Sequence, residues 1–312
     1  MTKYFFRVII TITIIIPCKK SKAQTDADAI MTNKNQLCNG FLYNYSSWDN
    51  YWEGKLKRTN LNLGTISTQS VMYMANYGIS NNLNLIVGTP YVWTKASAGT
   101  LAGMKGFQDI SAFLKWRFFN QKKGNSSVAL YTVGGFSTPL SNYTPDFQPL
   151  SIGLGSTNLT AKGMVDYRFK NFTVTGSAAY IWRSNLTIDR DAYYEGNQMH
   201  FTNKVEMPDV TNLQLRIGYR SRYFIAEGIL NQMTTHGGGD ITRNNMPFPS
   251  NRMNATSAGA FVKYTIPAFT HIELVGMANY TLNGRNVGQS TSYGGGVFYI
   301  FYLNKKSNPA YK

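Results

Sequence analysis

Apolar and polar residues alternate along many segments of this chain, each about ten to twelve residues long. The alternation is clearest in residues 110–118, where Leu114 and Trp116 belong to one face and Lys115 and Arg117 to the other. Because successive side chains of a strand point to opposite faces, one face can contact lipid while the other borders a wet lumen. The pattern therefore predicts the strands of a transmembrane β-barrel.

The same alternation recurs in residues 159–169, 172–183 and 212–220. In each segment, most aliphatic and aromatic side chains fall on one face, and Ser, Thr, Asn, Gln and charged side chains fall on the other. A soluble β-sandwich also has alternating strands and is the competing interpretation. The connections and the leader described below favour the barrel.

The connections between these segments alternate in length along the chain. The short ones are residues 78–82, 120–125, 170–171, 220–222 and 265–270. The long ones are residues 49–58, 94–107, 139–156, 184–208, 235–251 and 283–289. Bacterial outer-membrane barrels have short periplasmic turns and long extracellular loops, so this alternation predicts which end of the barrel faces the periplasm.

The connections delimit about twelve predicted strands, an even number that places both chain ends in the periplasm. The second strand is the least regular, because Ser67 and Gln69 interrupt its apolar face, so roughly ten or fourteen strands also fit the pattern. The predicted strands are residues 37–48, 59–77, 83–93, 108–119, 126–138, 157–169, 172–183, 210–219, 223–234, 254–264, 271–282 and 291–303.

The predicted fold class is therefore all-β, an antiparallel up-and-down transmembrane barrel of about 12 strands. The barrel is expected to span residues 37–303. Residues 24–36 are expected to form a periplasmic N-terminal segment, and residues 304–312 a periplasmic C-terminal tail.

The N-terminus has the composition of a secretory signal peptide. Lys3 and Arg7 precede a short apolar run, residues 8–16, and small residues at Ser21 and Ala23 predict cleavage before Gln24. The apolar run is too short to span a bilayer as a helix, which takes about 20 residues. We therefore expect residues 1–23 to be removed and the protein to reside in the outer membrane of a Gram-negative bacterium.

Neither cysteine predicts a covalent site. Cys18 lies in the leader, and Pro17 stands where a lipidation site has Gly, Ala or Ser, so lipidation is disfavoured. Cys38 is then the only cysteine of the mature chain, which excludes an internal disulfide.

Charge and composition agree with export. Charged residues make up only 15% of the chain, and removal of the five basic residues of the leader lowers the net charge from +16 to +11. The remaining basic residues are scattered singly and form no basic helix or stripe, so no nucleic-acid partner is expected. The expected partners are outer-membrane lipid, lipopolysaccharide and a small-molecule solute, and the expected oligomeric state is a monomer.

Three stretches carry a resemblance to a known family. They are residues 76–91, which contain a Tyr-Gly-Ile turn and a Pro-Tyr strand end, residues 106–118, and residues 134–140. They resemble the outer-membrane proteins of the MetA-pathway phenol-degradation or putative transporter family. Gly106-Phe-Gln-Asp109 lacks the second glycine of the family pattern, Trp116 replaces a tyrosine, and Ser137-Thr-Pro139 inverts the last motif. The resemblance implies a barrel, export, and passage of small, including aromatic, compounds across the outer membrane.

No catalytic site is predicted, and the protein is not expected to be an enzyme. The chain has three histidines, of which His200 and His236 fall in predicted loops. His271 and Glu273 share the lumen face of one strand near the periplasmic rim, where an ion pair is favoured over a catalytic pair because no serine motif accompanies them.

No cofactor or metal site is predicted either. Hard cations bind clustered carboxylates, and the longest loop carries four acidic residues. Their spacing matches no known cation-binding loop, so a solvated loop is favoured for Asp189, Asp191, Glu195 and Glu206.

The lumen face carries the candidate functional residues. Basic side chains in a pore favour anions, whereas interior ion pairs can equally fill and rigidify a barrel. Inward apolar residues such as Ile225 and Phe298 could line a path for apolar solutes or pack against an inserted loop. The candidates for the lumen wall are Lys115, Arg117, Lys162, Asp166, Arg168, Arg183, Arg216, Glu227, Lys263 and Glu273.

The predicted function is that of an outer-membrane channel or uptake protein for small hydrophobic or anionic solutes. The first alternative is a structural or surface-binding outer-membrane barrel. The second alternative is a membrane-embedded lipid hydrolase.

The alternating connections generate a topology prediction. Cysteines introduced by Asn142→Cys and Asn244→Cys should react with a membrane-impermeant thiol reagent on intact cells, because both positions fall in predicted extracellular loops. Lys122→Cys should react only after the outer membrane is permeabilised. Reaction of Lys122→Cys on intact cells would contradict the predicted orientation of the barrel in the membrane.

Overall fold

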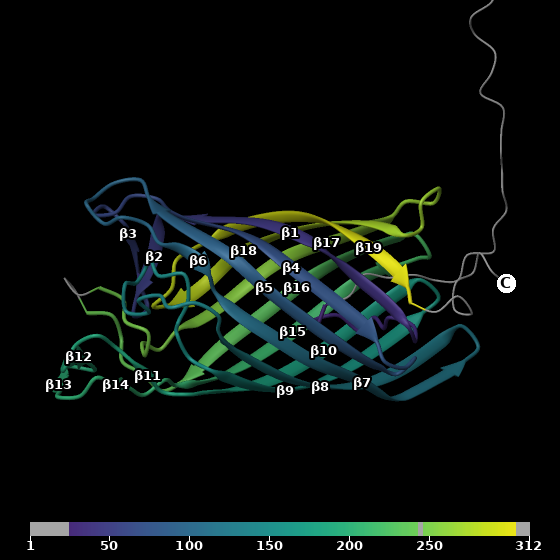
Figure 1. Ribbon diagram of the computed structural model, residues 1–312, viewed down its shortest axis with the longest axis horizontal. Coiled ribbons are helices and arrows are strands. Elements are labelled where there is room, and N and C mark those ends of the chain that lie inside the picture. Colours follow the sequence, from purple (N-terminus) through teal and green to yellow (C-terminus); the bar gives the residue numbers. More distant parts are fainter. Residues whose placement is uncertain (1–24, 243–245, 304–312) are drawn as a thin grey trace, which may run out of the picture.

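Twelve antiparallel strands close into a barrel in the computed structural model, which describes residues 25–242 and 246–303 (Figure 1). Neighbours in sequence are neighbours in the barrel, and β1 closes it by pairing with β19, Gln36 opposite Tyr302. The barrel strands are β1 (Gln36–Trp48), β4 (Ile66–Gly78), β5 (Leu83–Ala96), β7 (Asp109–Lys123), β8 (Ser126–Pro139), β9 (Asn158–Phe169), β10 (Phe172–Arg183), β15 (Asp209–Arg220), β16 (Phe224–His236), β17 (Asn254–Thr265), β18 (Ile272–Arg285) and β19 (Thr291–Tyr302).

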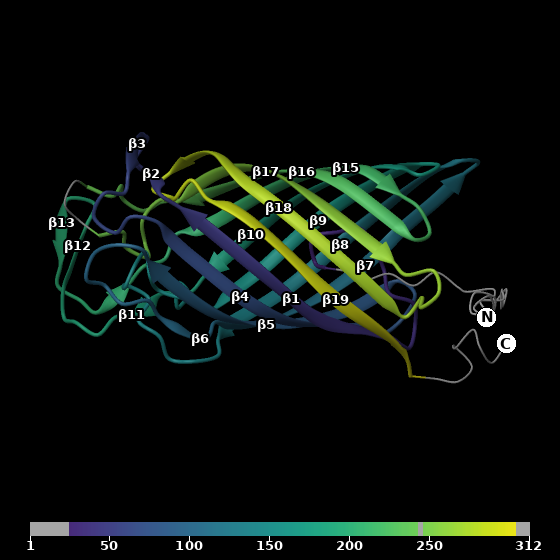
Figure 2. The same ribbon diagram turned by 90° about the horizontal axis from the view of Figure 1, so that it is seen from above.

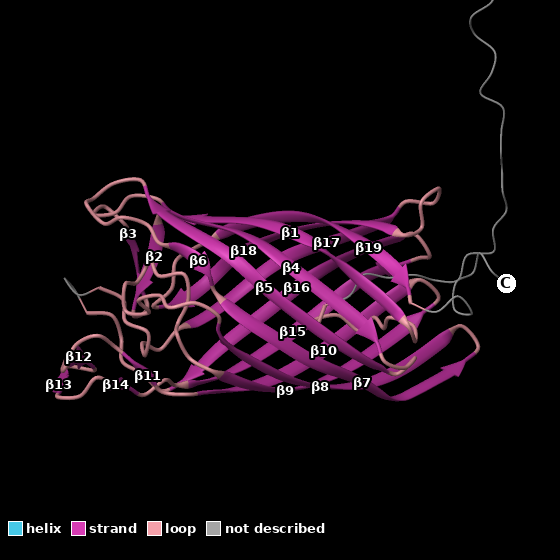
Figure 3. Cartoon of the chain, viewed as in Figure 1, coloured by secondary structure: helices cyan, strands magenta, loops and turns pink. Residues whose placement is uncertain are grey.

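The predicted fold class, an all-β antiparallel barrel of about 12 strands, is confirmed. The described chain consists of strands, turns and loops (Figure 3). No helix within it is long and apolar enough to cross a membrane. The predicted leader, residues 1–23, and the predicted tail, residues 304–312, lie outside the described residues.

The connections differ in length at the two ends, which we call the short-turn end and the long-loop end. Seven further short strands belong to the long connections, and Figure 2 shows most of them gathered beyond one mouth of the barrel. They are β2 (Asn50–Glu53), β3 (Leu56–Thr59), β6 (Lys105–Phe107), β11 (Leu186–Thr187), β12 (Tyr193–Glu195), β13 (Gln198–His200) and β14 (Lys204–Val205).

One predicted boundary differs markedly from the structure. The second strand was expected from residue 59, but β4 begins at Ile66, and β3 pairs instead with β2 in a separate hairpin. Gly64 has a φ of 63°, a left-handed conformation that interrupts an extended chain between β3 and β4.

The outer surface of the barrel is apolar. On β15, Leu213, Leu215 and Ile217 are exposed, while Arg216 and Arg220 between and beyond them are buried. Aromatic rings are exposed toward both ends of the wall, as expected where a barrel meets the two lipid headgroup layers. Those toward the short-turn end include Trp116, Phe118, Phe169, Phe172, Tyr219, Phe224, Tyr264 and Phe301, and those toward the long-loop end include Phe136, Trp182, Tyr280 and Tyr293.

The opposite faces of β15 allow a matched test of lipid exposure. Leu215 lies at the middle of the strand with 40% of its surface exposed, and its neighbour Gln214 lies on the inner face. Leu215→Arg should destabilise the barrel in lipid vesicles by about 2 to 4 kcal/mol, because it places a charge in the bilayer midplane. Gln214→Arg should cost much less in the same urea-unfolding experiment. Equal losses would contradict the assignment of the faces.

Candidate functional site: the lumen and its N-terminal segment

The chain that precedes β1 lies inside the barrel. We call residues 25–35 the lumen segment; in both Figure 1 and Figure 2 this purple part of the ribbon lies between the walls near the short-turn end. Ala29 packs among buried residues of β8 and β9, whereas the next residue, Ile30, packs on Ile225 of β16 and Phe261 of β17. Only β10 and β15 separate these two strand pairs, so the lumen segment contacts parts of the wall about a third of the ring of strands apart. Residues 24–36 were expected to form a periplasmic N-terminal segment; in the structure residues 25–35 lie in the lumen and Gln36 begins β1.

A tight turn directs the lumen segment inward. Asn35 has a φ of 61°, and its backbone N–H donates to the Gly78 carbonyl at 2.8 Å. A Cβ on Gly78 would overlap the carbonyl of Asn33, so only glycine permits this close approach. The base of the lumen segment is therefore held against the end of β4.

Lys115 of β7 is the main contact of the lumen segment. This side chain is fully buried, and its Nζ donates to the Asp28 carbonyl at 2.9 Å, the Ile30 carbonyl at 3.1 Å and Asp28 Oδ1 at 3.2 Å. It also donates to the Thr25 carbonyl. An ammonium group has three hydrogens, so these four acceptors satisfy it completely.

Two further wall residues bind the lumen segment. Lys162 Nζ of β9 lies 2.6 Å from Asp26 Oδ2, and this pair is only partly buried. The Tyr131 hydroxyl of β8 donates to the Ala29 carbonyl at 2.9 Å. Polar contacts from three adjacent strands therefore fix the lumen segment on one side.

A second charged network lies on the strands that follow. Arg220 forms ion pairs with Asp166 and Glu227, and its Nη2 donates to the Thr175 hydroxyl at 2.9 Å. Arg216 Nε lies 2.8 Å from Glu227 Oε2. The two guanidinium groups thus share one buried carboxylate.

Three of the predicted wall residues lie at the ends of the barrel rather than in this network. Arg117 donates to the side chain of Asn82 and the carbonyl of Asn81, and Arg168 donates to the carbonyls of Lys170 and Arg220, all at the short-turn end. Arg183 is half-buried where β10 ends at the long loops.

The predicted His271–Glu273 ion pair is not formed. Glu273 is buried and accepts from Lys263 Nζ and the Thr265 hydroxyl, both at 3.2 Å. His271 lies just before β18, where Nδ1 lies 3.3 Å from the Ile300 carbonyl. The strand end turns the imidazole toward β19, whereas Glu273 faces the lumen.

The other two histidines have loop and rim partners. His236 Nε2 lies 2.6 Å from the Thr211 hydroxyl, and His200 stacks on Tyr193. None of these three described imidazoles is hydrogen-bonded to a carboxylate side chain, so the hydrolase alternative gains no support.

Apolar side chains complete the filling of the short-turn end. Cys38 packs with Met74, Ile86, Phe298 and Ile300 on the wall formed by β1, β4, β5 and β19. Ile225 and Phe261 pack on Ile30, with Ile229 and Met277 beside them. Ile225 and Phe261 thus pack against an inserted part of the chain, as one of the two considered roles has it, but this part is the N-terminal lumen segment and not a loop.

The middle of the lumen has a different lining. Apart from Lys162, many of its inward positions are half-buried, uncharged polar side chains, so this part of the lumen is polar. Asn212 Oδ1 and Gln214 Oε1 are buried and have no hydrogen-bond partner within the described protein, although most buried polar atoms bond to protein groups or ordered water. The half-buried inward positions of the middle lumen include Asn44, Ser46, Thr68, Ser70, Ser111, Ser137, Thr160, Ser177, Asn212, Gln214, Asn231 and Ser292.

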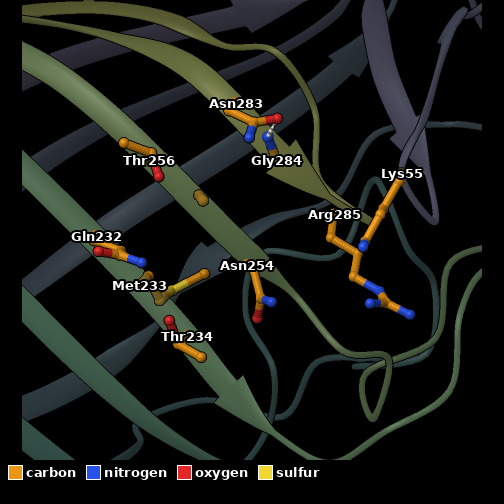
Figure 4. Close-up of a pocket in the computed structure, with 10 residues that line it drawn as sticks. Lys55, Gln232, Met233, Thr234, Asn254, Thr256, Asn283, Gly284 and Arg285 are labelled. Atoms are coloured by element: carbon orange, nitrogen blue, oxygen red, sulfur yellow. Dashed lines mark hydrogen bonds between the residues drawn. The ribbon is translucent and has the colours of Figure 1, made fainter.

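The long loops form a cap with cavities of its own. One cavity of about 390 Å³ lies between the β2–β3 hairpin and the ends of β16, β17 and β18, with Lys55 and Arg285 on one side and Gln232 and Thr256 on another (Figure 4). A second, of about 520 Å³, is lined by Phe147, Arg190, Tyr194, Met246 and Phe248 among others.

Ion pairs connect these loops. Arg285 donates two hydrogen bonds to Asp240, which lowers the pKa of that carboxyl, and Arg190 pairs with Asp146 at 2.8 Å. Of the acidic loop residues considered above, Glu195 accepts from the Gly239 amide. The described residues include no group of three or more His, Cys, Asp or Glu side chains placed to hold a metal ion.

The candidate residues predicted from the sequence omitted the acids of the lumen segment. Asp26 and Asp28 bind Lys162 and Lys115, and Arg220 connects Asp166 with Glu227. Alternation already placed Arg220 on the inner face. The only sequence signal for Asp26 and Asp28 was the Asp-Ala-Asp triplet that they form just after the predicted cleavage position.

The Arg220 network generates a stability prediction. Arg220→Met removes the shared partner of two buried carboxylates and should lower the free energy of unfolding by about 3 to 5 kcal/mol, measured by urea titration in detergent or lipid. Arg222→Met alters an exposed guanidinium that lies 4.9 Å from the Tyr223 ring and should have a small effect. A loss below about 1 kcal/mol for Arg220→Met would show that the network does not stabilise the barrel.

Solved structures provide the comparison with known proteins. No model of a known protein family matches the sequence, and no curated protein matches it. The COG4313 outer membrane channel from Pseudomonas putida F1 is similar over 90% of this chain and 100% of that chain, with a TM-score of 0.68 and 14% sequence identity. Two further solved structures are less similar. The NanC porin has 10% identity over 83% of this chain and 98% of that chain, with a TM-score of 0.42. The translocator domain of autotransporter NalP from Neisseria meningitidis has 10% identity over 88% of this chain and 90% of that chain, with a TM-score of 0.44. At these identities the likeness to the channel establishes the barrel fold, and the MetA-pathway family itself is not confirmed.

Proposed function

We propose that the protein is an outer-membrane channel for small polar solutes and that the lumen segment restricts its short-turn mouth. The observation that carries the proposal is the largely uncharged, half-buried lining of the middle lumen, which lies between the filled short-turn end and the loop cap. A structural barrel has no need of such a lining, because a lumen packed with side chains is more stable than a polar and partly open one.

The location in the outer membrane is part of the same proposal. The apolar exterior and the exposed aromatic rings at both ends match a bilayer-spanning barrel. Short turns then lie in the periplasm, so the lumen segment enters from the periplasmic side. The fold shared with the COG4313 outer membrane channel supports a channel role without naming a solute.

A surface-binding barrel is the second candidate. The cavity of about 520 Å³ among the long loops, where the Arg190 guanidinium lies 5.5 Å from the Phe248 ring, is large enough for a small molecule. A loop cavity also suits the outer mouth of a channel, so it does not favour surface binding over transport.

Adjacent positions on β10 provide a test. Ser177 lies on the inner face of β10 and Ala178 on the outer face. In planar bilayers the unaltered protein should produce discrete current steps, and Ser177→Trp should reduce their size at least about twofold by narrowing the lumen. Ala178→Trp, which adds the same ring on the lipid side, should leave the steps unchanged.

The outcomes separate the two candidates. Equal effects of the two substitutions would mean that the current does not pass through the barrel. A complete absence of current, including in variants that release the lumen segment, would favour the surface-binding barrel.

A further inference from the structure

Five basic side chains form ion pairs inside the barrel, within the described part of the chain. The strands themselves supply only three acidic partners, Asp166, Glu227 and Glu273. The lumen segment supplies the other two, Asp26 and Asp28. Among these ion-paired side chains, the wall has a surplus of two positive charges, which the lumen segment neutralises; Arg117 and Arg168 bind carbonyl and amide oxygens instead.

The surplus is localised on two lysines. Arg216, Arg220 and Lys263 each form an ion pair with an acid of the strands. Lys115 and Lys162 instead form theirs with the lumen segment, and their hydrogen bonds described above all end on its atoms. If the lumen segment moves away, these two ammonium groups lose their counter-ions in a region of low dielectric.

The two lysines lie in one row of the barrel wall. Val133 of β8 is the register partner of Lys115 on one side and of Lys162 on the other. Adjacent strands are about 4.8 Å apart, so the two lysine backbones are separated by roughly 10 Å. Val133 is buried in the same cluster as Ala29, which lies next to Asp28 in the lumen segment. The lumen segment, whose Asp26 and Asp28 are two residues apart, therefore covers the row that contains the two lysines.

We propose that Lys115 and Lys162 form an anion site of the lumen, that Asp26 and Asp28 occupy it as an internal ligand, and that small organic dicarboxylates open the channel by competing for it. This inference rests on the proposed channel function and names its solute class and its regulation. Carboxylate groups accept charge-assisted hydrogen bonds from ammonium groups, as the two aspartates do. A dicarboxylate can replace both aspartates at once, whereas a neutral molecule of the same shape cannot.

Because the lumen segment is attached to β1, a free dicarboxylate needs a high concentration to displace the two aspartates. A ligand tethered by a short linker has an effective concentration in the millimolar range. A free dicarboxylate must therefore reach millimolar levels to displace the aspartates. Salt weakens the competition, since charges in contact with water are screened over about 10 Å at 0.1 M.

Release of the lumen segment can be measured directly in the protein inserted into lipid vesicles. Ala29→Cys places a thiol at a buried position of the segment, and the native Cys38, buried in the wall, reports on unfolding of the barrel. In vesicles at low salt, succinate at about 10 mM should accelerate maleimide labelling of Ala29→Cys at least tenfold while Cys38 stays protected. Succinamide, the neutral diamide of the same shape, should have no effect. Equal labelling rates with the two compounds would overturn the proposal.

Conductance provides the second measurement. Asp26→Asn/Asp28→Asn removes the internal ligand and should raise the current without succinate at least tenfold. Asp240→Asn, which removes an acid of the loop cap, should leave the dependence on succinate unchanged. Lys115→Met/Lys162→Met should abolish the response to succinate in both measurements, and Lys115→Arg/Lys162→Arg should retain it. A normal succinate response in the methionine variant would contradict the assignment of the site.

Failure of this inference can be distinguished from failure of the proposed function. If Asp26→Asn/Asp28→Asn conducts but succinate neither exposes Ala29→Cys nor changes the current of the unaltered protein, the channel stands and the anion site is wrong. If none of the chains conducts while Ala29→Cys becomes labelled, the channel function is wrong and the two lysines bind anions without transport.

Discussion

Hydrogen bonding between β1 and β19 is the constraint on which the rest of the structure depends. Lipid supplies no partner for a backbone N–H or C=O, so a sheet in the membrane must have no free edge. Closure by this strand pair satisfies every strand from both sides and creates an inside that lipid cannot reach. Leu215 can then face lipid while its neighbour Arg216 is buried among charged partners.

The enclosed charges determine what else enters the barrel. A buried ion costs several kcal/mol of desolvation unless a partner and hydrogen bonds compensate it. Arg216 and Arg220 obtain this compensation from acids on nearby strands, but Lys115 obtains it from the lumen segment. The lumen segment therefore completes the wall electrostatically, and an anion that replaced its aspartates would supply the same compensation to the lysines.

The two ends of the barrel are closed by different parts of the chain. The short-turn end is filled by the lumen segment, the ion pairs and the apolar cluster around Cys38. The long-loop end is covered by hairpins and loops joined by pairs such as Arg285–Asp240. Uncharged polar side chains line the space between, where a solute would make many weak contacts and could leave again.

The sequence by itself determined the barrel class, most of its about twelve strands and their faces, because period-two alternation and turn length are local properties that lipid and closure enforce on every strand. It failed where local pattern was insufficient, as at β4, whose start depends on a left-handed turn at Gly64. Alternation also placed Lys115, Asp166 and Glu227 on the inner face. Only the tertiary structure decided their partners, since Lys115 and Asp28 are 87 residues apart and Arg220 and Asp166 are 54 apart, and such pairs meet only after the barrel closes. The position of residues 25–35 in the lumen could not be predicted from the sequence for the same reason. The segment has no periodicity of its own, and its place depends on the surplus charge of a wall that exists only in the folded barrel.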